Sequence, residues 1–391
     1  MQLLNSRIRI GTRSMTKTGD YDIRLWPASH LAWEPKGSAS RQIAVLMSGG
    51  VDSSVTASLL KEAGWEVLGV TMKIPISCDT GIRSCCGTGA AVVCRELAIP
   101  HYFVDVTRAF QQLIVENFRQ VYSKGHTPNP CADCNTFLKF SLVWDFIERQ
   151  FGASFLATGH YAKVSELKGR YRLGMAEYKP KDQSYFLYGI LKGRLPKFVL
   201  PLGDMAKEQV RAKAVALGLS VADKPESMEL CFAGEGDYRV ALSAEQASRE
   251  GDITNMRGEV IGRHKGIANY TLGQRRGIGY AGGQPLYVGR IDAANNTIAL
   301  GTRDEVCCAS ISASDLNVLI PEEFIQGAQP RAKIRSYGQA NPCTITKLTA
   351  DAVTVEFDTP QFAPSPGQKL VLYNAEDNIV AGGTISITSN A

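Results

Sequence analysis

The stretch Gln42-Ile-Ala-Val-Leu-Met-Ser-Gly-Gly-Val-Asp-Ser-Ser54 decides the fold of this chain. Its first six residues are an apolar run of the length and composition of a buried parallel strand. Two glycines and small polar residues follow, and Val55–Ala63 then has a helical pattern that stops at Gly64. A buried strand, a glycine turn and a helix in this order predict the start of a βαβ unit.

The chain beyond this stretch continues to alternate between strand and helix patterns. We predict strands at Glu66–Lys73, His101–Val104 and Ser154–Ala157, and helices at Ala90–Ala98, Thr107–Lys124 and Phe137–Phe151. In Phe137–Phe151 the apolar positions recur three and four residues apart, as on one face of an α-helix. This alternation predicts a doubly wound α/β domain with a parallel sheet.

The pattern changes after about residue 235. Residues 250–300 are rich in glycine and in short β-like pieces, and from Pro330 onward short alternating segments are separated by turns. We therefore expect a small central β-rich domain and a C-terminal antiparallel β-barrel. The divisions we expect are a disordered extension (1–40), the α/β domain (41–235), the central domain (236–305) and the barrel (306–391).

Composition excludes several classes of protein. The 391 residues are 44% hydrophobic and 21% charged, which is ordinary for a globular chain and excludes a fibrous or disordered one. No apolar run approaches the roughly 18 residues of a membrane span, so we expect no membrane partner. Ten cysteines in a chain of this size, without a compact apolar leader, indicate reduced thiols and a cytoplasmic location.

The net charge of +5 permits a polyanionic partner without requiring one. Basic residues concentrate in two parts of the chain, which either bind nucleic acid or are ordinary solvated faces. They are Lys179, Lys181, Lys192, Arg194, Lys197, Lys207, Arg211 and Lys213, and then Arg257, Arg263, Lys265, Arg275 and Arg276.

The turn Ser48–Ser54 is a candidate phosphate cradle. Glycines let the backbone approach an anion, and the N-terminus of the following helix presents N–H groups to it. The Walker Gly-Lys-Ser/Thr ending and the G-x-G-x-x-G spacing are both missing. The simpler interpretation is a tight, capped strand–helix turn. The string S-G-G-x-D-S nevertheless resembles the PP-loop of ATP pyrophosphatases, which cleave ATP to AMP and pyrophosphate.

The cysteines supply a second candidate site. Cys131 and Cys134 stand in C-x-x-C spacing after two prolines, and Cys134 comes just before a helix, where a thiolate is stabilised. Cys231 is the third candidate, although a cysteine between Leu and Phe is usually core. A zinc site, a thioredoxin-type pair, a sulfur-transfer pair and a three-cysteine iron–sulfur cluster are the alternatives. We interpret the other seven cysteines as structural.

Seven strings occur in an order that carries a resemblance to a family. They are Ser48–Ser54, Thr127–Asn135, Lys139-Phe140, Ala157–Tyr161, Lys181–Leu187, Cys231-Phe232 and Tyr270–Arg275. Together, over roughly residues 42–390, the chain resembles the bacterial-type tRNA-specific 2-thiouridylases, the MnmA family of the PP-loop superfamily. The resemblance implies ATP-dependent 2-thiolation of the wobble uridine of tRNA, with adenylation of O2 and sulfur relayed as a cysteine persulfide.

The resemblance also implies site residues, cofactors and partners. Cys134 matches the nucleophile and Cys231 the persulfide carrier. The ATP contacts match Leu46, Met47, Ser48, Gly49, Gly50, Val51, Asp52, Ser53, Met72 and Gly159. The tRNA or base contacts match Asn129, Pro130, Cys131, Lys181, Asp182, Gln183, Arg335 and Ser336. We expect ATP and Mg²⁺, tRNA, an upstream persulfide donor protein, a monomer, and a Cys134–Cys231 disulfide formed in turnover.

The chain departs from the family pattern at two positions. Cys131 stands where Asp is common, and Ser336 stands where Tyr is common. Three cysteines make a [4Fe-4S] cluster on Cys131, Cys134 and Cys231 the alternative to the two-cysteine relay. Rival functions are a PP-loop enzyme acting on a small molecule, and a tRNA-binding or metal-storage module with an inactive loop.

Overall fold

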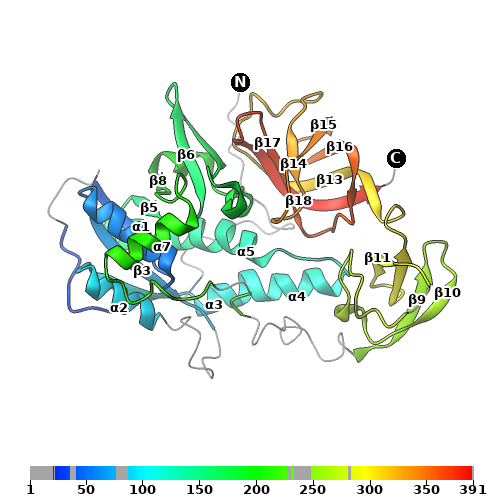
Figure 1. Cartoon of the computed structure of the whole chain (residues 1–391), viewed down its shortest axis with the longest axis horizontal. Helices are drawn as coiled ribbons and strands as arrows, with labels where there is room; N and C mark the ends of the chain where they lie inside the picture. Colours follow the sequence, from blue (N-terminus) through cyan, green and yellow to red (C-terminus); the bar gives the residue numbers. More distant parts are fainter. Residues whose placement is uncertain are drawn as a thin grey trace.

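The computed structural model describes residues 21, 23–35, 41–75, 87–226, 230–232, 248–280 and 283–389. These residues form an open sheet covered by helices, a two-stranded hairpin, a small central sheet and a closed barrel (Figure 1). The expected fold class, a doubly wound parallel-sheet domain followed by a central β-rich domain and an antiparallel barrel, is therefore confirmed.

The open sheet has the strand order β1-β4-β3-β2-β5-β8. Its strands are β1 (Arg24–Pro27), β2 (Gln42–Leu46), β3 (Glu66–Lys73), β4 (His101–Asp105), β5 (Phe155–Ala157) and β8 (Phe198–Val199). All neighbours from β4 to β8 are parallel. After β2 the chain first builds toward β4 and later toward β8, so the topological switch point lies between β2 and β5.

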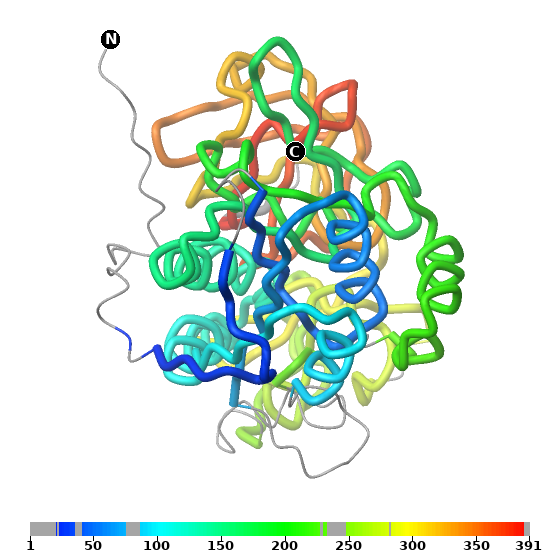
Figure 2. The backbone as a smooth tube through the Cα atoms, turned by 90° about the vertical axis from the view of Figure 1, so that its left-hand side faces the viewer, coloured from blue at the N-terminus to red at the C-terminus, as the bar shows by residue number. Residues whose placement is uncertain are grey.

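Part of the expected disordered extension, residues 1–40, is ordered instead. Arg24–Pro27 forms β1, which pairs antiparallel with β4 and closes that edge of the sheet. Trp33 then donates its indole N–H to the carbonyl of Phe151 at 3.0 Å. In Figure 2 this dark-blue segment runs along the edge of the domain. The segment escaped prediction because a four-residue edge strand is too short to show a period. Residues 1–20, 22 and 36–40 lie outside the described residues.

Helices cover both faces of the sheet (Figure 2). One face carries α1 (Val51–Glu62), α2 (Thr88–Glu96) and α7 (Lys207–Ala216). The other carries two long helices, each interrupted by a π-helical stretch. The first is α3 (Thr107–Phe110), η4 (Gln111–Val115) and α4 (Glu116–Ser123); the second is α5 (Pro130–Asp133), η5 (Cys134–Val143) and α6 (Trp144–Phe151). The sequence predicted both helices but not their π-helical stretches, because its apolar spacing fits an ordinary α-helix.

A hairpin and three 3₁₀ segments connect this domain to the barrel. The hairpin is β6 (Ala162–Leu167) and β7 (Arg170–Met175), and the 3₁₀ segments are η6 (Lys179–Lys181), η7 (Ser184–Leu187) and η8 (Lys192–Lys197). A single bridge joins Gly174 of β7 to Asn378 of the barrel. Tyr185 and Leu187 are completely buried, so this connector is part of the core.

The central sheet has the order β10-β9-β12-β11. Its elements are β9 (Gly251–Asn255), β10 (Val260–His264), η11 (Ile267–Asn269), β11 (Tyr287–Asp292) and β12 (Thr297–Gly301). The pair β9–β12 is parallel and the other two pairs are antiparallel. Ile253, Val288 and Ile298 are fully buried and form its own small core.

The C-terminal strands close into a six-stranded antiparallel barrel in the order β13-β16-β15-β14-β17-β18. They are β13 (Cys307–Val318), β14 (Arg331–Lys333), β15 (Asn341–Leu348), β16 (Ala352–Phe362), β17 (Lys369–Tyr373) and β18 (Ile379–Ser389). Barrel residues such as Val371 share one apolar cluster with Leu138 of η5. Among the described residues, no helix is long and apolar enough to cross a membrane.

Candidate active site

The glycine turn follows β2 at the carboxyl edge of the sheet. Gly49 has φ +71°, a backbone conformation that glycine adopts without strain. The Ser48 and Ser53 hydroxyls lie 3.1 Å apart, and the Ser54 hydroxyl donates to the Gly50 carbonyl at 2.8 Å. The first-turn N–H groups of α1, which have no preceding helical carbonyls to bond, therefore face a preformed loop suited to an anion.

Asp52 of this loop lies in a charged network. The Lys207 ammonium, on a side chain only 6% exposed, is 2.7 Å from Asp52 Oδ1 and 2.8 Å from Glu226 Oε1. The Tyr161 hydroxyl donates to Asp52 Oδ1 at 2.8 Å. Hydrogen bonds from Lys181 and Lys207 lower the pKa of Glu226 to about 2. Asp52 is thus held in one position by side chains from two other elements.

Gly159 brings the end of β5 against the same loop. A Cβ atom at Gly159 would lie 2.7 Å from Ser53 N and 2.8 Å from the Asp52 carbonyl carbon. The glycine turn after β2 and the turn after β5 therefore meet at the topological switch point, where open α/β sheets bind ligands. Met72, near the carboxyl end of β3, is partly buried at the same edge of the sheet.

Cys134 lies where α5 becomes η5. The Asn129 side chain caps α5 by accepting from Ala132 N at 3.1 Å, and Pro130 occupies the first helical position. The prediction of a stabilised thiolate just before a helix is wrong, because Cys134 lies inside the helix and is 8% exposed. Burial raises the pKa of its thiol to about 11, although Lys139 opposes this shift. Burial likewise raises the pKa of Cys131, whose side chain reaches solvent at one side.

The π-helical turn decides which side chain accompanies Cys134. In an α-helix, residue 139 would lie about 140° around the axis from residue 134. The i→i+5 hydrogen bonds of a π-helix bring it back toward the same face. Lys139 donates to Asn135 Oδ1 at 2.9 Å, and its charge also acts on His160. The Lys139 charge also acts to lower the pKa of the Cys134 thiol, so a cation accompanies this thiol.

The Cys134 helix also meets the turn that contains Gly159. The ring of Phe140 in η5 packs edge-on against His160 with 6.1 Å between centroids. Burial and the Lys139 charge lower the pKa of His160 to about 3, so this imidazole is neutral. It shares a hydrogen bond of 2.8 Å with the Thr158 hydroxyl. The Thr158–Tyr161 turn thus contacts both the nucleotide loop, Ser48–Ser54, and the cysteine helix, which is the long helix α5–η5–α6 with Cys134.

Cys231 lies on a short segment that packs against the α3–α4 helix. Phe232 stacks edge-on with Phe110 and Phe118, at 6.0 and 5.2 Å between centroids. The thiol itself is exposed, which differs from the core position that its apolar neighbours suggest. Cys134 and Cys231 are not joined by a disulfide in this structure. No group of three or more possible metal ligands gathers within the described ranges, which include Cys131, Cys134 and Cys231.

The expected tRNA contacts have partners inside the protein. Lys181 is paired with Glu226 at 2.7 Å. Asp182, whose side chain is 1% exposed, is paired with Lys333 at 3.0 Å, and Gln183 Oε1 accepts from the Tyr161 N–H.

The two expected contact residues of the barrel, Arg335 and Ser336, lie beside a small cavity. The Arg335 guanidinium donates to the carbonyls of Phe362 and Ala363, at 2.7 and 2.9 Å. Ser336 is half-buried and adjoins Tyr337, which is 75% exposed. A cavity of about 180 Å³ adjoins Arg335 and Tyr337.

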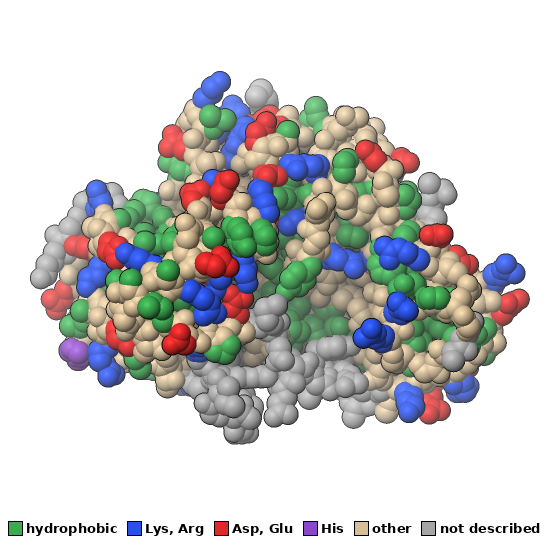
Figure 3. All heavy atoms as spheres, viewed as in Figure 1, with side chains coloured by type: hydrophobic (Ala, Val, Ile, Leu, Met, Phe, Trp, Pro, Cys, Tyr) green, Lys and Arg blue, Asp and Glu red, His purple; other side chains and the backbone are tan. Residues whose placement is uncertain are grey.

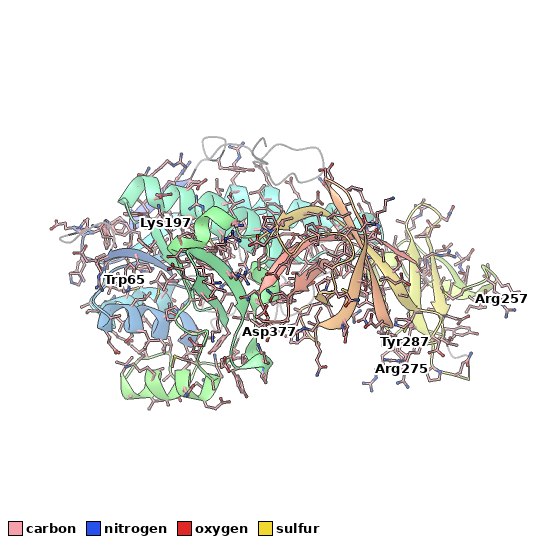
Figure 4. The ribbon with its side chains drawn as sticks, turned by 90° about the horizontal axis from the view of Figure 1, so that it is seen from above. Trp65, Lys197, Arg257, Arg275, Tyr287 and Asp377 are labelled. Carbon is pink, nitrogen blue, oxygen red and sulfur yellow. The ribbon has the colours of Figure 1, made fainter. Side chains whose placement is uncertain are left out.

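The two basic clusters of the sequence differ in the structure. In the first cluster, most members form ion pairs with acidic residues: Lys179 with Asp377, Lys181 with Glu226, Arg194 with Asp145, Lys197 with Glu148, and Lys213 with Glu62. In the second, Arg257 and Arg275 extend outward from the central sheet (Figure 4). On one face of the molecule, Lys and Arg gather where the barrel meets the central sheet (Figure 3).

Several site residues cannot be recognised at the level of sequence. Lys207 and Tyr161, which hold Asp52, come from distant positions, and the sequence places Lys207 only among the basic clusters. Lys139 belongs to one of the seven strings that carry the family resemblance, but the sequence assigns it no function. No spacing rule links these residues, since each reaches the site only through the packing of the sheet and helices.

A glycine loop at the switch point of a parallel sheet, and a second turn that packs against both this loop and the helix of a buried cysteine, define a nucleotide-binding enzyme of the PP-loop class. Three family models match the chain: the tRNA methyl transferase HUP domain at residues 41–235, the tRNA methyl transferase PRC-barrel domain at 240–302, and the aminomethyltransferase beta-barrel domain at 309–385. Named relatives, which are about 40% identical to it over most of their length, show that the chain belongs to the tRNA-specific 2-thiouridylase (MnmA) family.

The chain is similar to named relatives over most of its length and to a solved structure over about half of it. The chain is 41% identical to tRNA-specific 2-thiouridylase MnmA of Pelotomaculum thermopropionicum, over 89% of this chain and 98% of that protein. It is 42% identical to the MnmA of Pelobacter propionicus, over 88% and 97%. The U34-tRNA thiolase NcsA from Methanococcus maripaludis with its [4Fe-4S] cluster is 24% identical over 48% of this chain and 61% of that one, at a TM-score of 0.31. That score supports no argument about the cluster.

Proposed function

We propose that this chain is a tRNA-uridine 2-sulfurtransferase: it adenylates O2 of U34 with ATP and replaces that oxygen with sulfur from a cysteine persulfide. The products are 2-thiouridine in tRNA, AMP and pyrophosphate. Family membership supports the reaction. The structural observation that carries it is the Thr158–Tyr161 turn, which links the glycine loop to the π-helical stretch η5 that begins at Cys134.

The first step needs a phosphate cradle and a bound base. We assign ATP to the loop formed by Leu46–Ser53, with Gly159 opposite it and Met72 at the same sheet edge. O2 of the uracil attacks the α-phosphate, and the bond to the β-phosphate breaks, so that pyrophosphate leaves into the N-terminus of α1. ATP enters with Mg²⁺, which prefers phosphate and carboxylate oxygens, and Asp52 is the carboxylate of this loop.

The second step replaces oxygen with sulfur. We assign the persulfide to Cys231, whose exposed thiol can be loaded by a donor protein. Its terminal sulfur attacks C2, and AMP leaves with the oxygen. The Cys134 thiolate then attacks the Cys231 sulfur, which releases the thiolated base and forms a Cys134–Cys231 disulfide that a thiol reductant must reduce. Alternatively, Cys134 first releases hydrosulfide from Cys231, and hydrosulfide attacks C2, with the same disulfide formed.

The RNA-binding surface completes this proposal. We retain Asn129–Cys131, Lys181–Gln183 and Arg335-Ser336 as segments near the base or the anticodon arm. A groove of about 520 Å³ between the end of α4 and β11 is lined by Lys124 and Arg290, with Asp292 as the one acidic residue among the described lining residues, and the two cations are placed to contact phosphates. We also propose that the central domain contacts tRNA, and that the enzyme is a cytoplasmic monomer.

The function is tested by reconstituting the reaction with tRNA transcript, ATP and a persulfide donor. We expect 2-thiouridine at position 34 by mass spectrometry of digested tRNA, and AMP release that depends on tRNA. Cys231→Ser is expected to release AMP but form no 2-thiouridine. AMP release at the same rate without tRNA would favour a small-molecule substrate and contradict the proposal.

The cluster-dependent thiolase stays as the second candidate, because Cys131 supplies a third cysteine. It requires Cys131, Cys134 and Cys231 to converge, which they do not in the described structure. Iron and acid-labile sulfide are assayed on protein purified without oxygen. Stoichiometric amounts of both would establish this alternative, and thiolation by iron-free protein would eliminate it.

A further inference from the structure

The barrel reaches the cysteine helix through the residue at the start of β17. The Lys369 ammonium lies 2.7 Å from Asp133 Oδ1, and both side chains are only 5% exposed. Asp133 directly precedes Cys134. Its second carboxylate oxygen accepts from the Asn117 side chain at 3.2 Å. Burial lowers the pKa of Lys369, but Asp133, Tyr188 and Tyr185 together outweigh this effect and raise it, so the Lys369 ammonium is charged.

The preceding residue, Gln368, holds the chain that enters the same helix. Its side-chain NH₂ donates to the carbonyls of Thr127 and Pro128, at 3.2 and 3.0 Å. Its side-chain carbonyl accepts from Asn129 at 3.1 Å, and Asn129 in turn caps α5. One barrel residue therefore ties down three successive residues that immediately precede α5.

These contacts matter because α5 is a single turn that leads into a π-helix. As the first turn of the long helix α5–η5–α6, it has N–H groups without preceding helical carbonyls, so its geometry depends on capping and on tertiary contacts. The barrel provides such contacts on both sides of the cap, from Gln368 before α5 and from Lys369 at the last residue of α5. The π-helical register that brings Lys139 toward Cys134 starts at the residue after Asp133.

We infer that Gln368 and Lys369 are positioning residues, through which the C-terminal barrel fixes the Cys134 thiol relative to the nucleotide loop. This rests on the proposed role of Cys134 as the nucleophile. The barrel thereby acts in the chemistry as well as in any contact with RNA.

A second interdomain ion pair offers a matched control. Lys333 of β14 is paired with Asp182 at 3.0 Å, and the two side chains are 8% and 1% exposed. It also joins the barrel to the α/β domain, but at the segment after β7 rather than at the cysteine helix. Loss of the Lys333–Asp182 ion pair should loosen the same domain interface without disturbing the π-helical stretch η5, which begins at Cys134.

The test compares Lys369→Met, Gln368→Ala and Lys333→Met in the full chain. Each is measured for the thiolation kcat, for the KM of ATP, and for the alkylation rate of Cys134 by peptide mass spectrometry. We expect Lys369→Met and Gln368→Ala to lower kcat at least tenfold with the KM of ATP within twofold, and to raise Cys134 alkylation at least fivefold. Lys333→Met should leave Cys134 alkylation within twofold of the parent.

Gln368→Ala keeps the inference testable if Lys369→Met does not fold, since it leaves every buried charge paired. Wild-type kcat and wild-type Cys134 alkylation in Gln368→Ala would overturn the inference. So would an equal rise of alkylation in Lys333→Met, which would mean general loosening of the interface. Cys134→Ser separates the two proposals: if that variant still thiolates tRNA, the assigned nucleophile is wrong, whatever the effect of Gln368 and Lys369.

Discussion

Gly159→Ala is the sharpest test of the nucleotide site. The new methyl carbon would lie 2.7 Å from Ser53 N and 2.8 Å from the Asp52 carbonyl carbon, both backbone atoms. The two backbones must part by about 0.7 Å to reach an ordinary contact of 3.4 Å, because neither atom can rotate away as a side chain could. The strain arises only from this contact, because Gly159 does not have the positive φ that would itself disfavour alanine.

Two effects follow from this displacement. Overpacking of this kind costs about 1–3 kcal/mol of unfolding free energy. Misplacing a catalytic group by about 1 Å can cost on the order of 100-fold in rate, so a 0.7 Å shift of the glycine loop predicts a loss of about 10- to 100-fold in tRNA-dependent AMP release. The same shift is expected to weaken ATP binding, because the loop N–H groups no longer converge on the phosphates.

The matched control is Gly193→Ala. Gly193 is exposed, and nothing lies within 4 Å of the position that its new methyl carbon would take. Its unfolding free energy should change by less than about 1 kcal/mol, since only backbone entropy differs. ATP affinity is measured by calorimetry, AMP release by chromatography and stability by urea unfolding. A Gly159→Ala enzyme with parental ATP affinity and parental AMP release would refute this account of the site.

Three further predictions concern charges. Lys139→Met removes the cation that opposes burial at Cys134, so the thiol pKa rises beyond about 11 and alkylation of Cys134 at pH 9 should slow several-fold; an unchanged rate would contradict the assigned influence of Lys139. Lys207→Met leaves Asp52 without its buried cation and should lower the unfolding free energy, measured in urea, by at least about 2 kcal/mol. Lys213→Met removes an ion pair at the surface and should lower it by less than about 1 kcal/mol. The affinity for tRNA should fall by about 10²- to 10³-fold between 50 and 200 mM salt, and a flat dependence measured by filter binding would argue against phosphate contacts.

Local sequence determined much of this fold. The apolar run Gln42–Met47, the glycines after it and the helical pattern that follows correspond to β2, the loop and α1. Glu66–Lys73 is a strand with the bounds expected, and five barrel strands, β14 to β18, lie where alternating segments stand between turns. The sixth, β13, precedes Pro330 and is not among the predicted segments. Such elements are readable because burial on one face of a strand or helix imposes its own period.

Elements without a period of their own could not be read in this way. Strand β1 has four residues and depends on the open edge of β4. The π-helical turns of η4 and η5 keep apolar spacing that an α-helix also satisfies, so the sequence cannot distinguish the two. The register of η5, and with it the place of Lys139, is therefore a property of the packed domain.

The site divides along the same line. The sequence by itself located the loop Ser48–Ser54 and marked Cys134, in its C-x-x-C spacing, as a candidate, because residues that are neighbours in the chain form both patterns. Only the tertiary structure placed Lys207 on Asp52 and Lys369 on Asp133, pairs separated by 155 residues and by more than half the chain. A buried charge requires a partner, but its energy depends on distance in space and burial, which sequence separation does not record.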